Sequence, residues 1–199
     1  MDVVGSVSGK LLPTGNARDV IDGIEVTCID VAMPMILMRA KDFGISGYEG
    51  RPEFAANKEL FARIEPIRRK AGEMMGFGDV TDKVIPKVGL LSPPRDANGT
   101  ITSRYLTPHA LHAAHAVTGA VCVASACALE GSIAHEVAKA DDGNPRTVWI
   151  EHPSGQVDVR LETKGKGADM DVVAGTLRTA RPIMKGEVLV PASLWPGHG

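Results

Sequence analysis

The sequence contains few cysteines and few aromatic residues, and it carries little net charge. Its three cysteines are odd in number and form no Cys-x-x-Cys pair, which favours free thiols in a reducing compartment over a disulfide framework. Aromatic residues make up only 4% of the chain, so no platform for stacking nucleic-acid bases is visible. A formal net charge of −2 gives no basic footprint for nucleic acid or for an anionic membrane surface. We therefore expect no nucleic-acid and no membrane partner.

A recognisable targeting segment is also missing. The first ten residues, MDVVGSVSGK, contain no basic region followed by an apolar stretch, so no signal peptide is expected and a cytoplasmic location is predicted. Hydrophobic residues at 44% and charged residues at 23% lie in the ordinary globular range. A chain of 199 residues can bury one sizeable core, so a single domain over residues 1–199 is expected.

Charge is absent altogether between Arg104 and Glu130. This stretch opens with Thr107-Pro108, a hydroxyl suited to an N-cap followed by the helix position that tolerates proline. Small side chains occur on every side of the predicted helix 108–128, so we expect it to be buried all round. Gly119 is unfavourable in a helix interior, and its presence suggests that another backbone passes close by. Polar residues dilute the run and no basic cluster flanks it, which disfavours a membrane span.

The rest of the chain alternates between strand and helix patterns. Runs rich in β-branched residues predict strands over 24–29, 35–38, 84–91, 101–105, 146–151, 156–162, 169–173 and 187–190. Helices are expected over 56–75, with a kink at Pro66, over 130–140 and over 175–186. Together these elements predict an α+β fold, in which a bent, mostly antiparallel, β-barrel-like sheet surrounds the central buried helix 108–128.

Three histidines and three cysteines are the first candidates for chemistry. His109, His112 and His115 recur every three residues, but they drift around a helix and have no acidic residue nearby. Structural roles are therefore favoured over a metal site, although a neutral imidazole at His115 could donate to an anion. No basic group near a cysteine would stabilise its thiolate, so no nucleophile is nominated. We expect no metal and no cofactor.

Two stretches could hold an anion or another ligand. Residues 175–181 combine a glycine, threonine caps and a predicted helix start with Arg178 and Arg181, whose forked donors suit carboxylates. A surface helix with solvated arginines is an equally good interpretation. Asp30–Pro34 interrupts two apolar strands, and such a corner either holds a ligand or is a simple strand kink.

Four segments together resemble the 4-oxalomesaconate tautomerase/PrpF family, which belongs to the diaminopimelate-epimerase-like superfamily. They are GKLLPTG (9–15), VTCIDVAMPMILMRAKDFGISGYEG (26–50), HAVTGAVCVASA (115–126) and GTLRTARPIMKGEVLVP (175–191). The resemblance implies two similar domains, each a β-barrel around a central helix, with the active site in the cleft between them. Members shift a proton along an allylic system in a small unsaturated polycarboxylate without a cofactor.

The resemblance extends only to the C-terminal half of the family. It implies that the half carrying the catalytic lysine and cysteine is absent, that no catalytic residue lies in this chain, and that the tail 174–199 packs on that half or that the chain forms a homo-oligomer. Met33-Pro34 stands where related epimerases carry Asn-Pro, and Pro182 replaces a more usual arginine. The substrate-binding residues that we expect here are Met33, Pro34, His115, Thr118, Gly119, Arg178 and Thr179.

The expected function is that of the carboxylate-binding half of a cofactor-independent tautomerase acting on a substrate such as 4-oxalomesaconate. Proton transfer next to a carbonyl needs a positioned acid and base, and this chain shows no convincing supplier of either. Two alternatives stay open, namely a non-catalytic carboxylate-binding or accessory module, and an isomerase acting on aconitate or methylitaconate.

Overall fold

Eight strands form one open sheet in the computed structural model, which describes residues 6–107, 109–177 and 179–195. The strands are β1 (Asp19–Ile21), β2 (Ile24–Asp30), β3 (Pro34–Arg39), β4 (Lys87–Ser92), β5 (Ile101–Leu106), β6 (Arg146–His152), β7 (Gly155–Lys164) and β8 (Asp171–Gly175). Their order in the sheet follows the chain from β1 to β8. Neighbouring strands are antiparallel except for β3–β4 and β5–β6, which are parallel. The fold is therefore α+β with a mostly antiparallel sheet, as predicted.

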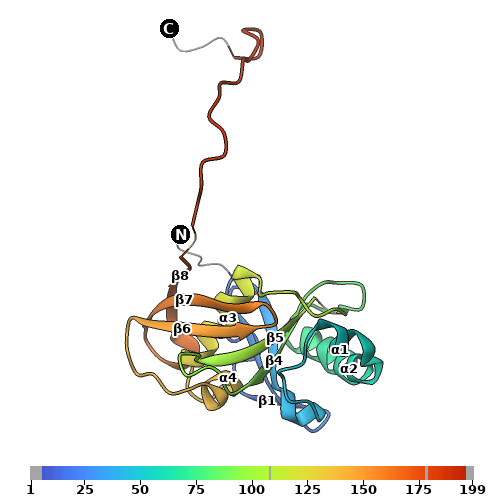
Figure 1. Cartoon of the computed structure of the whole chain (residues 1–199). Coiled ribbons are helices and arrows are strands. Elements are labelled where there is room, and N and C mark those ends of the chain that lie inside the picture. The colour runs from blue at the N-terminus through green and yellow to red at the C-terminus, as the bar shows by residue number, and fades with distance from the viewer. Residues whose placement is uncertain (1–5, 108, 178, 196–199) are drawn as a thin grey trace.

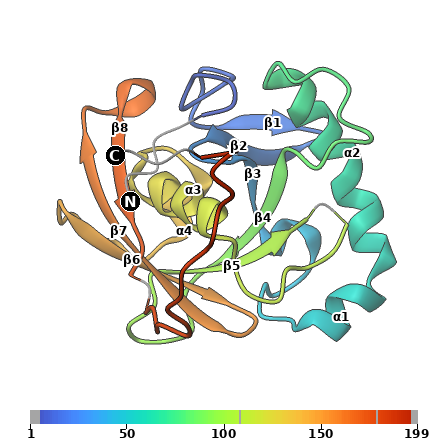
Figure 2. The same ribbon diagram turned by 90° about the horizontal axis from the view of Figure 1, so that it is seen from above.

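Helix α3 (Val117–Ala128) lies against the concave face of this sheet, where strands curve around it (Figure 2). It contacts β2, β3, β6, β7 and β8, and residues 119–127 are all buried. Burial on every side follows from its sequence, because an uncharged helix of small residues has no face that gains from water. Among the described residues, no helix is both long and apolar enough to cross a membrane.

The predicted start of this helix is wrong. Ala116 precedes the first helical turn in an extended conformation, so α3 begins at Val117 and not at residue 108. A bridge between Leu106 and Leu111 and a bond from His112 N to the Tyr105 carbonyl (2.9 Å) hold the preceding stretch as a turn instead. Thr107 therefore caps no helix, and Pro108 lies outside the described residues.

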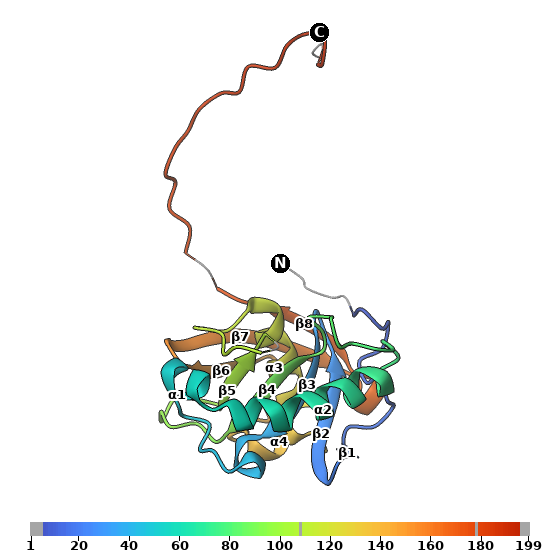
Figure 3. The same ribbon diagram turned by 90° about the vertical axis from the view of Figure 1, so that its right-hand side faces the viewer.

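The outer face of the sheet is covered by α1 (Arg51–Ala56) and α2 (Lys58–Met74), as Figures 1 and 3 show. Buried α2 residues such as Ile64 and Ile67 pack with Ile36 and Leu90 of the sheet in a second hydrophobic core. Asn57 caps α2 by accepting a bond from the Leu60 amide at 3.0 Å. The helix predicted over 56–75 is thus confirmed within two residues, with its proline inside it.

Among the remaining elements, β1 was not predicted, and the agreement with the prediction ends at β8. The predicted hairpin of β6 and β7 is present, and the helix predicted over 130–140 is the shorter α4 (Ile133–Val137). Two short 3-10 helices, η1 (Ala40–Phe43) and η2 (Gly167–Asp169), complete the fold. The helix predicted over 175–186 and the strand over 187–190 are wrong, because the described residues 179–190 form neither. They run away from the body, where no strand lies beside them to accept their backbone hydrogen bonds (Figure 1).

Candidate functional site

The sheet topology brings the β2–β3 corner and the end of β5 to one end of the sheet. Val88 near the start of β4 pairs with Leu106 at the end of β5, and Lys87 pairs with Met35 near the start of β3. The β2–β3 corner and the loop that leads into α3 therefore share this end. Of the predicted residues, Met33 and Pro34 lie at the β2–β3 corner, and His115, Thr118 and Gly119 lie just before or at the start of α3.

The corner between β2 and β3 is a tight turn. Pro34 pairs with Asp30 across it, and Ala32 within it adopts a positive φ of 59°. Val31 is buried and the half-buried Met33 packs against the hydrophobic core around α3. The corner therefore presents backbone and apolar side chains, with no side-chain amide such as an asparagine would supply at position 33.

The N-terminus of α3 offers backbone donors to a ligand. Its first intrahelical bond runs from Ala120 N to the Ala116 carbonyl at 2.8 Å, and no side chain caps the end. The amides of Val117, Thr118 and Gly119 precede that bond and have no acceptor within the helix. Unpaired amides and the helix dipole together favour an anion such as a carboxylate.

His115 is held immediately before this helix end by two hydrogen bonds. Its Nδ1 lies 3.2 Å from the Ala116 carbonyl, which can only accept, so the proton belongs on Nδ1. Its Nε2 then accepts from the Ser103 hydroxyl at 3.1 Å. Burial lowers the pKa of His115 to about 4, because the charged ring loses its hydration, so the ring is neutral at pH 7. Both ring nitrogens are engaged within the protein, and the imidazole supports the start of α3.

Gly119 allows close contact between α3 and β5. A Cβ at this position would lie 2.5 Å from Cε2 of Tyr105, closer than carbon atoms can approach. Another group does lie close to Gly119, as predicted. That group is the aromatic ring of Tyr105, so the prediction that a backbone passes close by is wrong. The same ring packs against His115 at an interplanar angle of 40°, with 4.8 Å between the ring centroids.

The anion site that was predicted at a helix start in residues 175–181 is not formed as expected. Thr179 is exposed in the extended segment beyond β8, and Arg181 is exposed with it. Because none of the described residues within 175–181 is helical, they offer no helix dipole to an anion. Arg178 lies outside the described residues.

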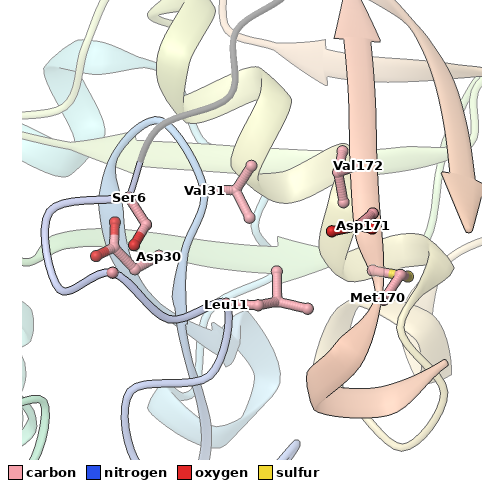
Figure 4. A pocket seen from close by; sticks show the side chains of 8 residues that line it. Ser6, Leu11, Asp30, Val31, Met170, Asp171 and Val172 are labelled. Atoms are coloured by element: carbon pink, nitrogen blue, oxygen red, sulfur yellow. The ribbon is translucent and has the colours of Figure 1, made fainter. Parts of the chain in front are cut away.

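A pocket of about 260 Å³ lies between the end of β2 and the start of β8 (Figure 4). It is lined by Ser6, Gly9, Leu11, Asp30, Val31, Met170, Asp171 and Val172. A second, wider cavity of about 690 Å³ adjoins it along residues 9–15 and 168–171. Sequence reasoning did not predict this pocket. Asp30 and Val31 of its lining belong to the Asp30–Pro34 corner, for which the sequence left open a ligand site or a simple strand kink.

Asp30 is fully buried at one end of that pocket. Its Oδ2 accepts a bond from the Ser8 amide at 2.6 Å, and its own amide donates to the Leu11 carbonyl at 3.0 Å. These bonds attach residues 8–11 to the end of β2. In the described part of the chain, its Oδ1 has no hydrogen-bond partner.

The cysteines are packing residues. Cys28, Cys122 and Cys127 are all free and buried, and burial raises the pKa of each thiol to about 12. They are therefore protonated at neutral pH and poor nucleophiles, in line with the sequence interpretation. No group of three or more metal-ligating side chains occurs within residues 6–107, 109–177 and 179–195.

Comparison with known proteins adds an independent finding. A model of the PrpF protein family matches residues 1–191. The chain is 49% identical to the (4E)-oxalomesaconate Delta-isomerase of Novosphingobium sp. strain KA1, over 95% of this chain and 52% of that protein. It is 42% identical to the 4-oxalomesaconate tautomerase of Pseudomonas putida, over 98% of this chain and 53% of that protein.

A solved structure is also similar. The crystal structure of methylitaconate-delta-isomerase matches with a TM-score of 0.82 and 30% sequence identity, over 94% of this chain and 53% of that one. The chain thus spans about half the length of the curated relatives that it matches.

Proposed function

Because the chain belongs to the PrpF protein family, we propose that it is part of an isomerase that moves a proton along an allylic system in a small unsaturated polycarboxylate. The observation that carries this proposal is the match over residues 1–191, together with relatives named for oxalomesaconate isomerisation at 42% and 49% identity. The proposed reaction needs an acid, a base and donors for the developing enolate, but no redox or group-transfer cofactor.

In this proposal the chain is the carboxylate-binding half of a two-domain enzyme. The relatives contain about as much further sequence again, which supports a second domain of similar size. The curved sheet with α3 against its concave face then corresponds to one barrel-like domain with its central helix. The family resemblance assigns the lysine and the cysteine that act as acid and base to the other domain.

The N-terminus of α3 is the proposed carboxylate subsite. The amides of Thr118 and Gly119 supply fixed donors, and the β2–β3 corner at Met33-Pro34 forms an adjacent wall. His115 acts in this subsite by holding the first turn of α3. We place Thr179 and Arg178 on the tail, which we propose packs on the second domain or on a second copy of the chain.

The test is turnover of 4-oxalomesaconate, followed by ultraviolet absorbance. The chain is assayed alone and together with the N-terminal half of a full-length relative. Turnover is expected only for the combination, because the chain by itself lacks the acid and the base. Substantial turnover by the chain alone would show that the catalytic groups lie within it. Failure of every combination that forms a stable complex would contradict the isomerase assignment.

The Arg178→Ala variant distinguishes the two proposed functions, an enzyme and a non-catalytic carboxylate-binding module. An enzyme whose tail reaches the active site should lose turnover in the complemented assay, whereas a carboxylate-binding module should lose only affinity. Arg69→Ala is the matched control, because Arg69 is exposed on α2, on the other face of the sheet. The control variant is expected to behave as the unmodified chain in both assays.

A second substrate is favoured by the structural similarity to methylitaconate-delta-isomerase. Methylitaconate, aconitate and 4-oxalomesaconate carry the same type of allylic proton between carboxylates. Measuring kcat/KM for the three in the complemented assay decides among them. We expect 4-oxalomesaconate to give the highest value, since the relatives named for it have the higher identities of 42% and 49%.

A further inference from the structure

A groove of about 630 Å³ lies on the outer side of the fold, between the two surface helices and the loop that follows β5. Its walls come from α1, from the first turn of α2 and from residues 109–111. Helices α1 and α2 lie on the opposite side of the sheet from α3 (Figure 2). The groove shares no lining residue with the proposed carboxylate subsite at the start of α3, so it is a separate feature.

The body of the groove is apolar. Leu111 is buried at its base, Phe61 is half-buried and packs against the second hydrophobic core, and Ala55 of α1 lines the side. The loop wall is held by a backbone bond from Thr107 N to the Ala110 carbonyl at 2.9 Å. Such a concave apolar surface, held in place by the fold, is typical of a small-molecule site.

The charged groups that line the groove have one sign. Arg51 and Lys58 line it together with His109, and no aspartate or glutamate of the described residues does. His109 Nδ1 lies 3.8 Å from Glu65, whereas neither Arg51 nor Lys58 forms an ion pair within the described part of the chain. Both side chains are exposed, so a ligand in the groove can reach their charges. Charge complementarity therefore favours an anion with an apolar body.

We propose that this groove binds a small aliphatic monocarboxylate. The carboxylate would accept hydrogen bonds from the Arg51 guanidinium, which can engage both oxygens, and would pair with the Lys58 ammonium. The hydrocarbon chain would lie against Phe61 and Leu111 and lose its contact with water. A polycarboxylate fits poorly, because a second carboxylate would have to leave water for an apolar wall.

The test is a titration of the ¹⁵N-labelled chain with sodium hexanoate at constant ionic strength, followed by NMR. Saturable shifts are expected at the amides of Ala55, Phe61 and Leu111, with a dissociation constant of about 1 to 10 mM for so small a ligand. Hexylammonium, which has the opposite charge, and adipate, which has a second carboxylate, are expected to bind at least threefold more weakly. An absence of saturable shifts, or equal binding of hexylammonium, would overturn the proposal.

Charge variants test the basic side chains of the groove. Arg51→Ala and Lys58→Ala are each expected to weaken hexanoate binding at least threefold, because each removes one cation from the lining. Arg69→Ala is the matched control, since Arg69 is also exposed on α2 but lies outside the groove, and it should leave the affinity unchanged. Equal affinity in all three variants would show that the bound carboxylate does not contact these groups.

A shape variant tests the apolar body without changing the charge. Ala55→Leu places a larger side chain in the groove and is expected to weaken hexanoate binding at least tenfold. Ala62→Leu, at an exposed position of α2 outside the groove, is the control and should bind as the unmodified chain does. Circular dichroism checks that each variant is folded. Unchanged affinity in both Ala55→Leu and Arg51→Ala would refute the assignment.

The same spectra separate the groove from other sites of binding. Hexanoate shifts confined to Val117, Thr118 and Gly119 would place the ligand at the start of α3 and would contradict the proposal. Loss of self-association in Ala55→Leu, with no hexanoate binding to the unmodified chain, would assign the groove to a second copy of the chain instead. None of these measurements uses turnover, so their result is independent of the proposed isomerase activity.

Discussion

At the scale of single residues, the start of α3 is fixed by a cluster of four side chains and backbone groups. Ser103 and Tyr105 belong to β5. His115 bonds Ser103 and packs against the Tyr105 ring, and Gly119 lets that ring approach the helix. Each member is buried. The direction of the α3 amides therefore depends on side chains of β5 and on His115, as well as on the backbone at Gly119.

Gly119→Ala should destabilise the fold by about 1 to 3 kcal/mol, because the new methyl group overlaps the Tyr105 ring and this cost exceeds the helix propensity gained from alanine. Urea unfolding measures the change. Gly175→Ala is the matched control, since a Cβ there meets nothing within 4 Å and should leave the midpoint nearly unchanged. An unchanged midpoint for Gly119→Ala would show that Tyr105 moves aside without cost.

The lowered pKa of His115 predicts that the stability of the fold depends on pH. Its pKa falls from about 6.5 in the unfolded chain to about 4 in the fold, so the unfolded state binds more protons between these values. The free energy of unfolding should therefore drop as the pH is lowered from 6.5 to 4, by about 3 kcal/mol from this group. Replacing His115 with glutamine should flatten that part of the profile, as measured by urea unfolding at several pH values. An equally steep profile in the variant would assign the dependence to other groups.

At the scale of elements, an ion-pair network joins two strands to α4. Arg39 of β3 makes two bonds to Glu136 of α4, and it also pairs with Glu25 of β2 at 2.9 Å. Arg18 contacts the same Glu136 at 2.8 Å. Hydrogen bonds from Arg39, and then from Arg18, lower the pKa of Glu136 to about 2, and the Arg39 guanidinium is largely buried.

The lowered pKa of Glu136 should make the free energy of unfolding depend on pH in a second, more acidic range. Its pKa in the fold is below the unfolded value of about 4.5, so its stabilising effect is present above pH 4.5 and is lost as the pH falls through about 2. Glu136→Gln is expected to lower stability at pH 7 and to remove that part of the acid loss, measured by thermal unfolding from pH 7 to 2. Glu73→Gln, at an exposed position on α2, is the control and should retain the slope. Loss of the slope in both variants would contradict the network.

At the scale of the whole molecule, the tail beyond β8 is the unusual feature. Ile183, Met184, Val188 and Leu189 are 87% to 96% exposed, and the segment runs away from the body (Figures 1 and 3). An apolar segment of this kind marks an interaction surface. It supports the proposal that the tail packs on a second domain or on a second copy.

Deleting residues 177–199 should leave the melting temperature within about 2 °C, because the described tail side chains are mostly exposed and bury little area. Self-association, measured by analytical ultracentrifugation, should decrease at the same time. A variant that keeps the tail but carries serine at positions 183, 184, 188 and 189 is the matched control, and it should show the same decrease. A large fall in melting temperature would mean that the tail packs on the body of the chain.

Much of the fold was predictable because local patterns specified it. The alternation around Pro153-Ser154-Gly155 gave the β6–β7 hairpin, and apolar spacing gave α2. Within the candidate site, the β2–β3 corner and the special role of Gly119 were also visible in the sequence. The partner of Gly119 was not, since no local pattern shows which ring a glycine accommodates.

By itself, the sequence determined that an uncharged helix would be buried against a sheet and that the chain would resemble one family, because hydrophobic patterning and motifs are local properties. Only the tertiary structure decided that α3 starts at Val117, since the bond from His112 to the Tyr105 carbonyl competes with helix formation before it. The tail likewise lacks the predicted helix and strand because no other element pairs with it. The pocket at Asp30 is formed between β2 and β8, two segments that lie far apart in the chain, so the fold and no local sequence motif creates it.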